Sequence, residues 1–128
     1  MDRGMPEETS RRQLSVSVRR VGGGASAVVR PVGELDHHSA ATLRESLEAC
    51  VADGVARIVI DLSDLEFCDS TGLNVLLTTR IAAQAAGGEV HLAGMRPIVA
   101  RVLEITGAGA VFTVHGTLGD ALAALPAE

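Results

Sequence analysis

Apolar and polar residues alternate over two stretches in the first quarter of the chain, a pattern typical of β-strands. Leu14, Val16 and Val18 alternate with polar neighbours, and the β-branched run Ala25–Val32 follows after Gly22-Gly23-Gly24. Two such runs joined by glycines predict a β-hairpin. A phosphate-cradling loop is disfavoured, because these glycines lead into a strand instead of a helix and no lysine follows.

Later segments carry apolar residues every three or four positions, which is the helical period. The pattern, with its caps and breakers, predicts four helices: one from Ser39 as N-cap to Gly54, one from Asp69-Ser70-Thr71 to Gly87-Gly88, one from Pro97 to Thr106, and one over Leu118–Leu125. In the second helix we expect an apolar stripe to be buried, formed by Leu73, Leu76, Leu77 and Ile81. The polar stripe Ser70, Asn74 and Thr78 lies beside it and is expected to face solvent or a partner.

Short apolar runs between these helices predict further strands. They are Arg57–Leu62, Glu89–Ala93 and Ala110–Val114, with a loop at Ser63–Cys68. The order β-β-α-β-α-β-α-β-α predicts an α/β fold, in which a mixed, largely parallel sheet packs against about four helices. Residues 1–12 mix charge, glycine and proline and are expected to form a flexible tail, so that residues 13–126 form one domain.

Composition excludes several kinds of chemistry. All 11 basic residues are arginine, so neither a Schiff base nor a P-loop can use a lysine. The net charge of −5 and the two aromatic residues, Phe67 and Phe112, argue against direct nucleic-acid binding. Cys50 and Cys68 have neither zinc-site spacing nor a disulfide framework, so we expect two reduced, buried thiols and no cofactor.

No signal peptide and no membrane-spanning run is evident, because Met1–Gln13 is polar and charged and no stretch reaches about 20 apolar residues. We therefore expect a soluble, cytoplasmic protein with no membrane partner. An edge strand at the hairpin leaves a homodimer possible.

The turn Asp69-Ser70-Thr71-Gly72-Leu73 is the best candidate for a working surface, because it follows the central strand and opens the most amphipathic helix. Any of Asp69, Ser70 and Thr71 could cap the free N–H groups of that helix. A hydroxyl here also suits phosphorylation, which would add charge at a helix start without destroying the helix.

Three segments in order resemble the bacterial anti-sigma factor antagonists, which are STAS domains: Gly33-Glu34-Leu35-Asp36-His37-His38, then Ile60-Asp61-Leu62-Ser63-Asp64-Leu65, then Asp69-Ser70-Thr71-Gly72-Leu73. The resemblance runs from about Leu14 to Leu125 and includes Ile105-Thr106-Gly107. It implies a bacterial regulator of transcription that works by partner switching and is not an enzyme.

The resemblance also implies which residues do this. The unphosphorylated domain would bind an anti-sigma factor with serine kinase activity and so free a sigma factor. The kinase would phosphorylate Ser70, with Thr71 the weaker candidate, and a PP2C-type phosphatase would reverse it. The expected partner surface comprises Asp36, His37, His38, Asp69, Ser70, Thr71, Gly72, Asn74 and Thr78. Asn74 departs from the family pattern, since many members have glycine there.

Other readings of the polar residues are weaker. Asp36, His37 and His38 have no third ligand spaced for a tetrahedral metal site, and His91 and His115 are interpreted as lone structural residues. Cys68-Asp69-Ser70-Thr71-Gly72 lacks the first glycine of a hydrolase elbow, and an aspartyl-phosphate receiver would need a lysine. Two alternatives stay open: an STAS scaffold or transport-associated module without a phosphorylation switch, and a small-nucleotide binder.

Overall fold

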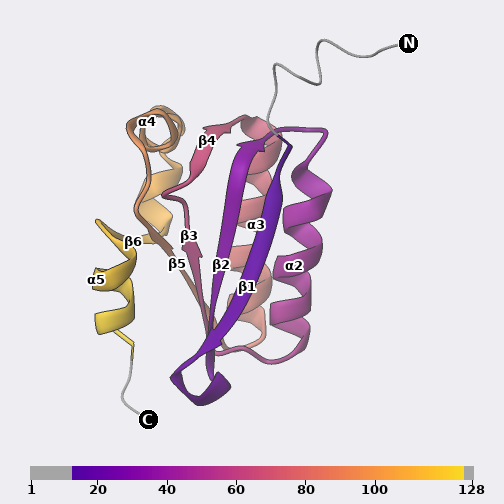
Figure 1. Cartoon of the computed structure of the whole chain (residues 1–128), viewed down its shortest axis with the longest axis vertical. Coiled ribbons are helices and arrows are strands. Elements are labelled where there is room, and N and C mark those ends of the chain that lie inside the picture. The colour runs from indigo at the N-terminus through magenta and orange to yellow at the C-terminus, as the bar shows by residue number, and fades with distance from the viewer. Residues whose placement is uncertain (1–12, 126–128) are drawn as a thin grey trace.

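A six-stranded sheet forms the middle of the structure (Figure 1), a computed structural model that describes residues 13–125. The strands are β1 (Ser15–Val21), β2 (Ser26–Leu35), β3 (Arg57–Asp61), β4 (Leu65–Cys68), β5 (Glu89–Ala93) and β6 (Thr113–His115). Their order across the sheet is β1-β2-β3-β5-β6, and β4 pairs with the far end of β2. The β1–β2 pair is antiparallel and the other pairs are parallel, which confirms the predicted hairpin and the largely parallel sheet.

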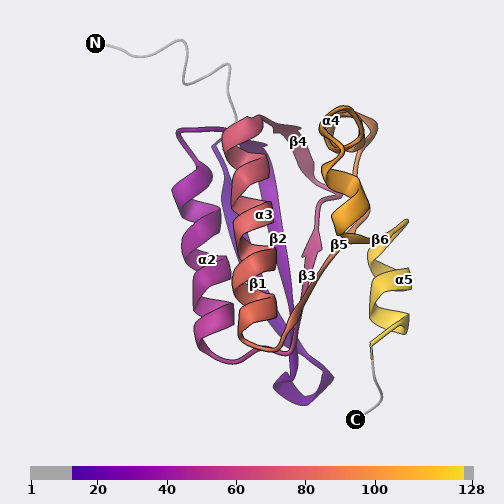
Figure 2. The same ribbon diagram turned by 180° about the vertical axis from the view of Figure 1, so that it is seen from behind.

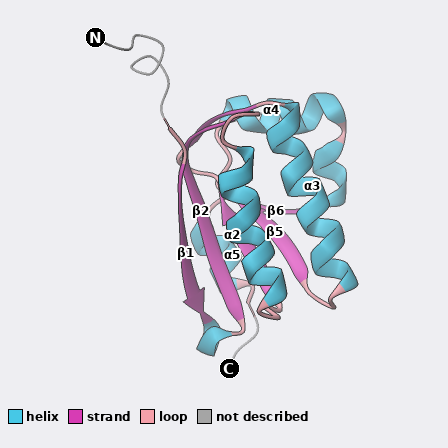
Figure 3. Cartoon of the chain, turned by 90° about the vertical axis from the view of Figure 1, so that its right-hand side faces the viewer, coloured by secondary structure: helices cyan, strands magenta, loops and turns pink. Residues whose placement is uncertain are grey.

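Four α-helices connect or follow the strands, as predicted. They are α2 (Ala40–Ala52), α3 (Ser70–Ala85), α4 (Pro97–Thr106) and α5 (Leu118–Ala123), and two 3-10 turns occur at η1 (Gly22–Gly24) and η2 (Ala108–Val111). Helices α2 and α3 lie side by side in front of the strands in Figure 2. Figure 3 shows from the side that β1 and β2 run along one side of this helix pair.

The predicted loop at Ser63–Cys68 is wrong over most of its length, because Leu65–Cys68 forms strand β4. Strand β2 is 10 residues long, and only its first part, Ser26–Val29, pairs with β3. Its last part, from Gly33 to Leu35, pairs with β4 instead, with a register shift between Gly33 and Glu34. A four-residue strand whose partner is the end of another strand has too short a pattern to be recognised from sequence.

The last strand is also displaced from its predicted position. The chain folds into η2 at Ala108–Val111, and strand β6 begins only at Thr113. Gly107 provides the left-handed residue (φ 76°) that ends α4. The 3-10 turn then brings the Phe112 ring into the core, where only 8% of the residue remains exposed. The apolar residues of this segment therefore reflect packing of a turn as well as a strand.

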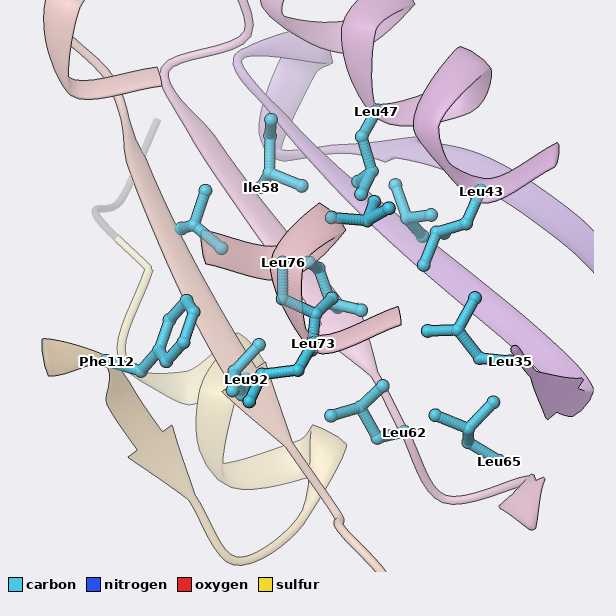
Figure 4. Packing of buried hydrophobic residues seen from close by; sticks show 14 of the residues in the cluster. Leu35, Leu43, Leu47, Ile58, Leu62, Leu65, Leu73, Leu76, Leu92 and Phe112 are labelled. Carbon is cyan, nitrogen blue, oxygen red and sulfur yellow. The ribbon is translucent and has the colours of Figure 1, made fainter. Parts of the chain in front are cut away.

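The main core lies between the sheet and the pair α2–α3. Figure 4 shows leucines of both helices meeting side chains from the sheet in one cluster. The labelled members are Leu35, Leu43, Leu47, Ile58, Leu62, Leu65, Leu73, Leu76, Leu92 and Phe112. Both cysteines are free and buried in this core, which confirms the prediction of two buried thiols at Cys50 and Cys68.

Helix α3 is rotated relative to the predicted apolar stripe. Leu73 and Leu76 are buried as expected, but Leu77 is only half-buried and Ile81 is 62% exposed. The buried face is completed by smaller residues instead, namely Gly72, Val75, Thr79 and Ala83. Small and β-branched side chains let α3 approach the sheet closely, and this shifts its buried face away from Ile81.

Helix α5 covers part of the opposite face of the sheet, where Ala121 packs with Val28, Val59 and Ala93. The Arg57 guanidinium donates to the Ala124 carbonyl at 3.1 Å and pairs with Glu89 at 2.9 Å. The His91 ring lies between Glu89 and His115. Its Nδ1 atom is 2.9 Å from Nε2 of His115, and its Nε2 atom is 2.9 Å from Oε1 of Glu89. The sequence predicts two isolated histidines, but in the structure His91 and His115 are paired across β5 and β6.

Candidate partner-binding site

The carboxyl ends of β2 and β4 meet at one end of the molecule, the upper end in Figure 1. The turn from β2 to α2, residues 36–39, and the start of α3 both leave the sheet there. This arrangement brings together the two segments that the sequence analysis placed on one surface, although 30 or more residues separate them in the chain.

Asp69 joins the two segments. Its Oδ1 atom accepts a hydrogen bond from the Gly72 N–H at 2.9 Å, which makes Asp69 the N-cap of α3. Its Oδ2 atom accepts from the His37 N–H at 3.1 Å, and its own N–H donates to the Leu35 carbonyl at 3.1 Å. Of the three capping candidates, the structure selects Asp69.

Asp36 organises the turn before α2. Its carboxylate is buried and accepts hydrogen bonds from the backbone N–H groups of His38 and Ser39, at 2.9 and 3.1 Å. Ser39 occupies the predicted N-cap position, but its side chain does not cap the helix. Its hydroxyl donates to the Glu34 carbonyl at 2.8 Å instead and accepts from the Asp36 N–H at 3.0 Å, which ties the turn to the end of β2. The role predicted for the Ser39 side chain is therefore wrong.

Gly72 allows α3 to begin against the end of β2. A Cβ atom at this position would lie 2.6 Å from Cγ of Leu35, whose side chain is fully buried. The contribution of Gly72 to the site is thus close approach. Both residues lie in the segments that carry the family resemblance, but their contact could not be predicted because nothing local links them.

The hydroxyl-bearing residues differ in their surroundings. Ser70 is exposed and Thr71 is half-buried. Within residues 13–125 neither hydroxyl makes a hydrogen bond, because Asp69 carries the cap. Asn74 and Thr78 are exposed on the same helix, as expected, but the Thr78 hydroxyl donates to the Asn74 carbonyl at 2.9 Å. The polar stripe therefore offers fewer free polar groups than its residue types indicate.

The two histidines lie at the rim of the site. Their ring centroids are 4.0 Å apart, and the His37 Nδ1 atom lies 3.8 Å from Oδ2 of Asp69. Both residues are exposed. Over residues 13–125, no three His, Cys, Asp or Glu side chains are grouped closely enough to hold a metal ion.

Charges below the site are partly compensated. The Arg30 guanidinium forms an ion pair with Asp64 and lies 3.9 Å from the buried carboxylate of Asp61. Asp64 therefore repels an added negative charge less than its proximity in sequence suggests. Cys68, directly before Asp69, is buried, and burial together with the Asp69 charge raises the pKa of its thiol to about 12. The thiol is neutral at ordinary pH.

Known proteins share this fold and this sequence pattern. The family model for the STAS domain matches residues 16–121. The chain belongs to the STAS domain family. An anti-sigma F factor antagonist of Paenibacillus polymyxa is 33% identical over 99 residues, which are 77% of this chain and 85% of that protein.

Solved structures of this family agree. An anti-sigma factor antagonist from Mycobacterium paratuberculosis is 33% identical, with a TM-score of 0.79 over 88% of this chain and 93% of that one. The anti-sigma factor antagonist SpoIIAA in its unphosphorylated form is 26% identical, with a TM-score of 0.73 over 84% of this chain and 93% of that one. In the part of the chain that the structure describes, no helix is long and apolar enough to cross a membrane.

Proposed function

We propose that this STAS domain is an anti-sigma factor antagonist whose contact with an anti-sigma factor is broken by phosphorylation of Ser70. The partner is an anti-sigma factor with serine kinase activity, and a PP2C-type phosphatase restores the binding form. The binding surface is the end of the molecule formed by Asp36, His37, His38, Asp69, Ser70, Thr71, Gly72, Asn74 and Thr78. The names of the relatives support the partner class, and one solved relative is described in an unphosphorylated form.

One observation carries the proposal. Asp69 caps α3 through Oδ1 and holds the neighbouring turn through Oδ2, so the exposed hydroxyl of Ser70 has no structural task among residues 13–125. Ser70 can thus be modified without breaking a hydrogen bond of the fold. Thr71 is the weaker acceptor because it is half-buried.

The magnitudes favour a switch of binding over a switch of folding. A phosphoserine adds about −1.5 to −2 charges at pH 7, and an anion at a helix N-terminus gains only about 0.3–1 kcal/mol. An unpaired charge pressed into an interface costs several kcal/mol, and the Asp69 carboxylate repels it further. Since each 1.4 kcal/mol is tenfold in affinity, phosphorylation releases the partner while the fold persists.

The test uses the full chain and the purified anti-sigma factor kinases from the same organism. With ATP, mass spectrometry is expected to find one phosphate on Ser70 and none on the Ser70→Ala variant. Ser70→Asp is expected to weaken binding at least tenfold, whereas Ser17→Asp is not. Ser17 is an exposed serine of β1 that pairs with Arg30 and lies on the α5 face of the sheet. If neither ATP nor the Ser70→Asp substitution changes the affinity for the kinase, the protein is a scaffold module without a switch.

A further inference from the structure

The outward side of α3 has an unusual composition. Ser70, Asn74, Leu77 and Ile81 recur at i, i+4, i+7 and i+11 and fall within an arc of about 60° on a regular helix. We name these four residues the α3 strip. Ile81 is 62% exposed and Leu77 is half-buried, so the strip is polar at the Ser70 end and aliphatic at the other.

Charge is sparse on this surface, because the single charged residue of α3, Arg80, is half-buried and lies beside the α3 strip. The exposed residues of α3 are Ser70, Asn74, Thr78, Ile81, Ala82, Gln84 and Ala85. Among the α-helices of residues 13–125, α3 is the only one without an exposed charged side chain, in a chain with 21% charged residues. Depletion of charge distinguishes the centre of protein interfaces from the rest of a protein surface. A single exposed isoleucine is ordinary, but one in a charge-free strip is not.

The aliphatic half of the strip, Leu77 and Ile81, loses little when water is removed from it. The Thr78 hydroxyl at its flank already donates to the Asn74 carbonyl at 2.9 Å. Ile81 and Leu77 carry no polar side-chain atoms. A partner that covers this part of α3 therefore gains apolar burial with few hydrogen bonds to replace.

A protein interface is large enough for one partner to cover both ends of the α3 strip. A stable contact buries about 800 Å² on each partner, a patch roughly 30 Å across, whereas Ser70 and Ile81 are separated by about 16 Å along the helix. A protein seated on Ser70 thus has room to cover Ile81 as well. We infer that the anti-sigma factor that binds at Ser70 also packs an apolar surface on Leu77 and Ile81, so that Ile81 is an anchor of the same interface. This inference rests on the proposed function.

The experiment measures the dissociation constant for whichever purified anti-sigma factor kinase of the same organism binds the unmodified chain most tightly. Ile81→Ser is expected to weaken binding at least tenfold and Ile81→Met by less than twofold, with the thermal midpoint unchanged because Ile81 is exposed. The matched control is Ile105→Ser on α4, where Ile105 is 71% exposed and binding should not change.

The outcomes separate the inference from the proposed function. If Ser70→Asp weakens binding while Ile81→Ser leaves it within twofold of the unmodified chain, the proposed function stands and the anchor role of Ile81 is wrong. Equal losses for Ile81→Ser and Ile105→Ser would also overturn the inference, since they would show a non-specific effect of exposed apolar residues. If the unmodified chain binds none of the kinases, the proposed function itself fails.

Discussion

The Oδ2 atom of Asp69 accepts a hydrogen bond from the backbone N–H of His37 at 3.1 Å, across 32 residues of sequence. The same carboxylate caps α3 through Oδ1 and the Gly72 N–H. One side chain therefore sets the position of Ser70 relative to the His37–His38 turn. A partner that contacts both segments depends on these hydrogen bonds of Asp69.

Replacing Asp69 should destabilise the fold measurably. Asp69→Ala removes the cap and the bond to the turn, and we expect a loss of about 1–3 kcal/mol in the free energy of unfolding. Asp69→Asn can keep one of the two acceptor contacts and should lose less. Urea unfolding at pH 7 checks this order. Equal losses for both variants would mean that the acceptor contact that asparagine retains contributes nothing.

Gly72→Ala tests the close approach of α3 to β2. The added Cβ would lie 2.6 Å from Cγ of Leu35, so overpacking should cost about 1–3 kcal/mol of stability. The matched control is Gly119→Ala in α5, where the nearest atom would be the Thr117 Oγ1 at 3.7 Å. Since alanine loses less chain entropy on folding, the control should be neutral or more stable by up to about 1 kcal/mol. Thermal unfolding of both variants gives the comparison.

Acid should weaken the Arg57–Glu89–His91 network. The hydrogen bond with His91 is the main cause that lowers the pKa of Glu89 below its ordinary value of 4.5, and Arg57 adds to it. A lowered pKa in the folded state means that the stabilisation is complete above about pH 4.5 and is lost as the pH falls through the folded value. The effect is small because Glu89 is largely exposed.

The measurement compares the unmodified chain with Glu89→Gln in urea. The difference between their free energies of unfolding should be larger at pH 7 than at pH 3. A difference that does not change with pH would show that the Glu89 charge is not involved. His115→Gln serves as a second variant, because it removes the other partner of His91 and leaves Glu89 in place.

The Cys68 thiol should be unreactive while the protein is folded. Burial is the main cause that raises its pKa to about 12, so the reactive thiolate is scarce at pH 8. We expect iodoacetamide to label Cys68 only when urea unfolds the chain. The raised pKa also gives a contribution to stability that is present below about pH 9 and is lost as the pH rises toward 12. Rapid labelling of Cys68 in the folded protein would contradict this burial.

Much of the fold follows from local patterns. The glycine turn between alternating strands predicted the β1–β2 hairpin, and the helical periods predicted α2, α3, α4 and α5. Pro97 marked the first turn of α4, and the β-branched run Arg57–Leu62 marked the central strand β3. These signals are local because propensity and period act over a few residues.

The site was predictable in part. The segments around Asp36 and Asp69 could be named from their residues, and the parallel sheet brings them to one end. Which residue would cap α3 could not be named, because Asp69, Ser70 and Thr71 are equivalent caps in a sequence. Whether these residues bind a partner stays a prediction.

The sequence by itself determined the elements, their order and the candidate hydroxyls, since each depends on neighbouring residues. Only the tertiary structure decided that Leu65–Cys68 pairs with the end of β2, that His91 meets His115, and that Ile81 faces outward. Each of these depends on residues far apart in the chain. The helical period predicts that α3 has two faces, but only the packing of α3 against the sheet determines which face is buried.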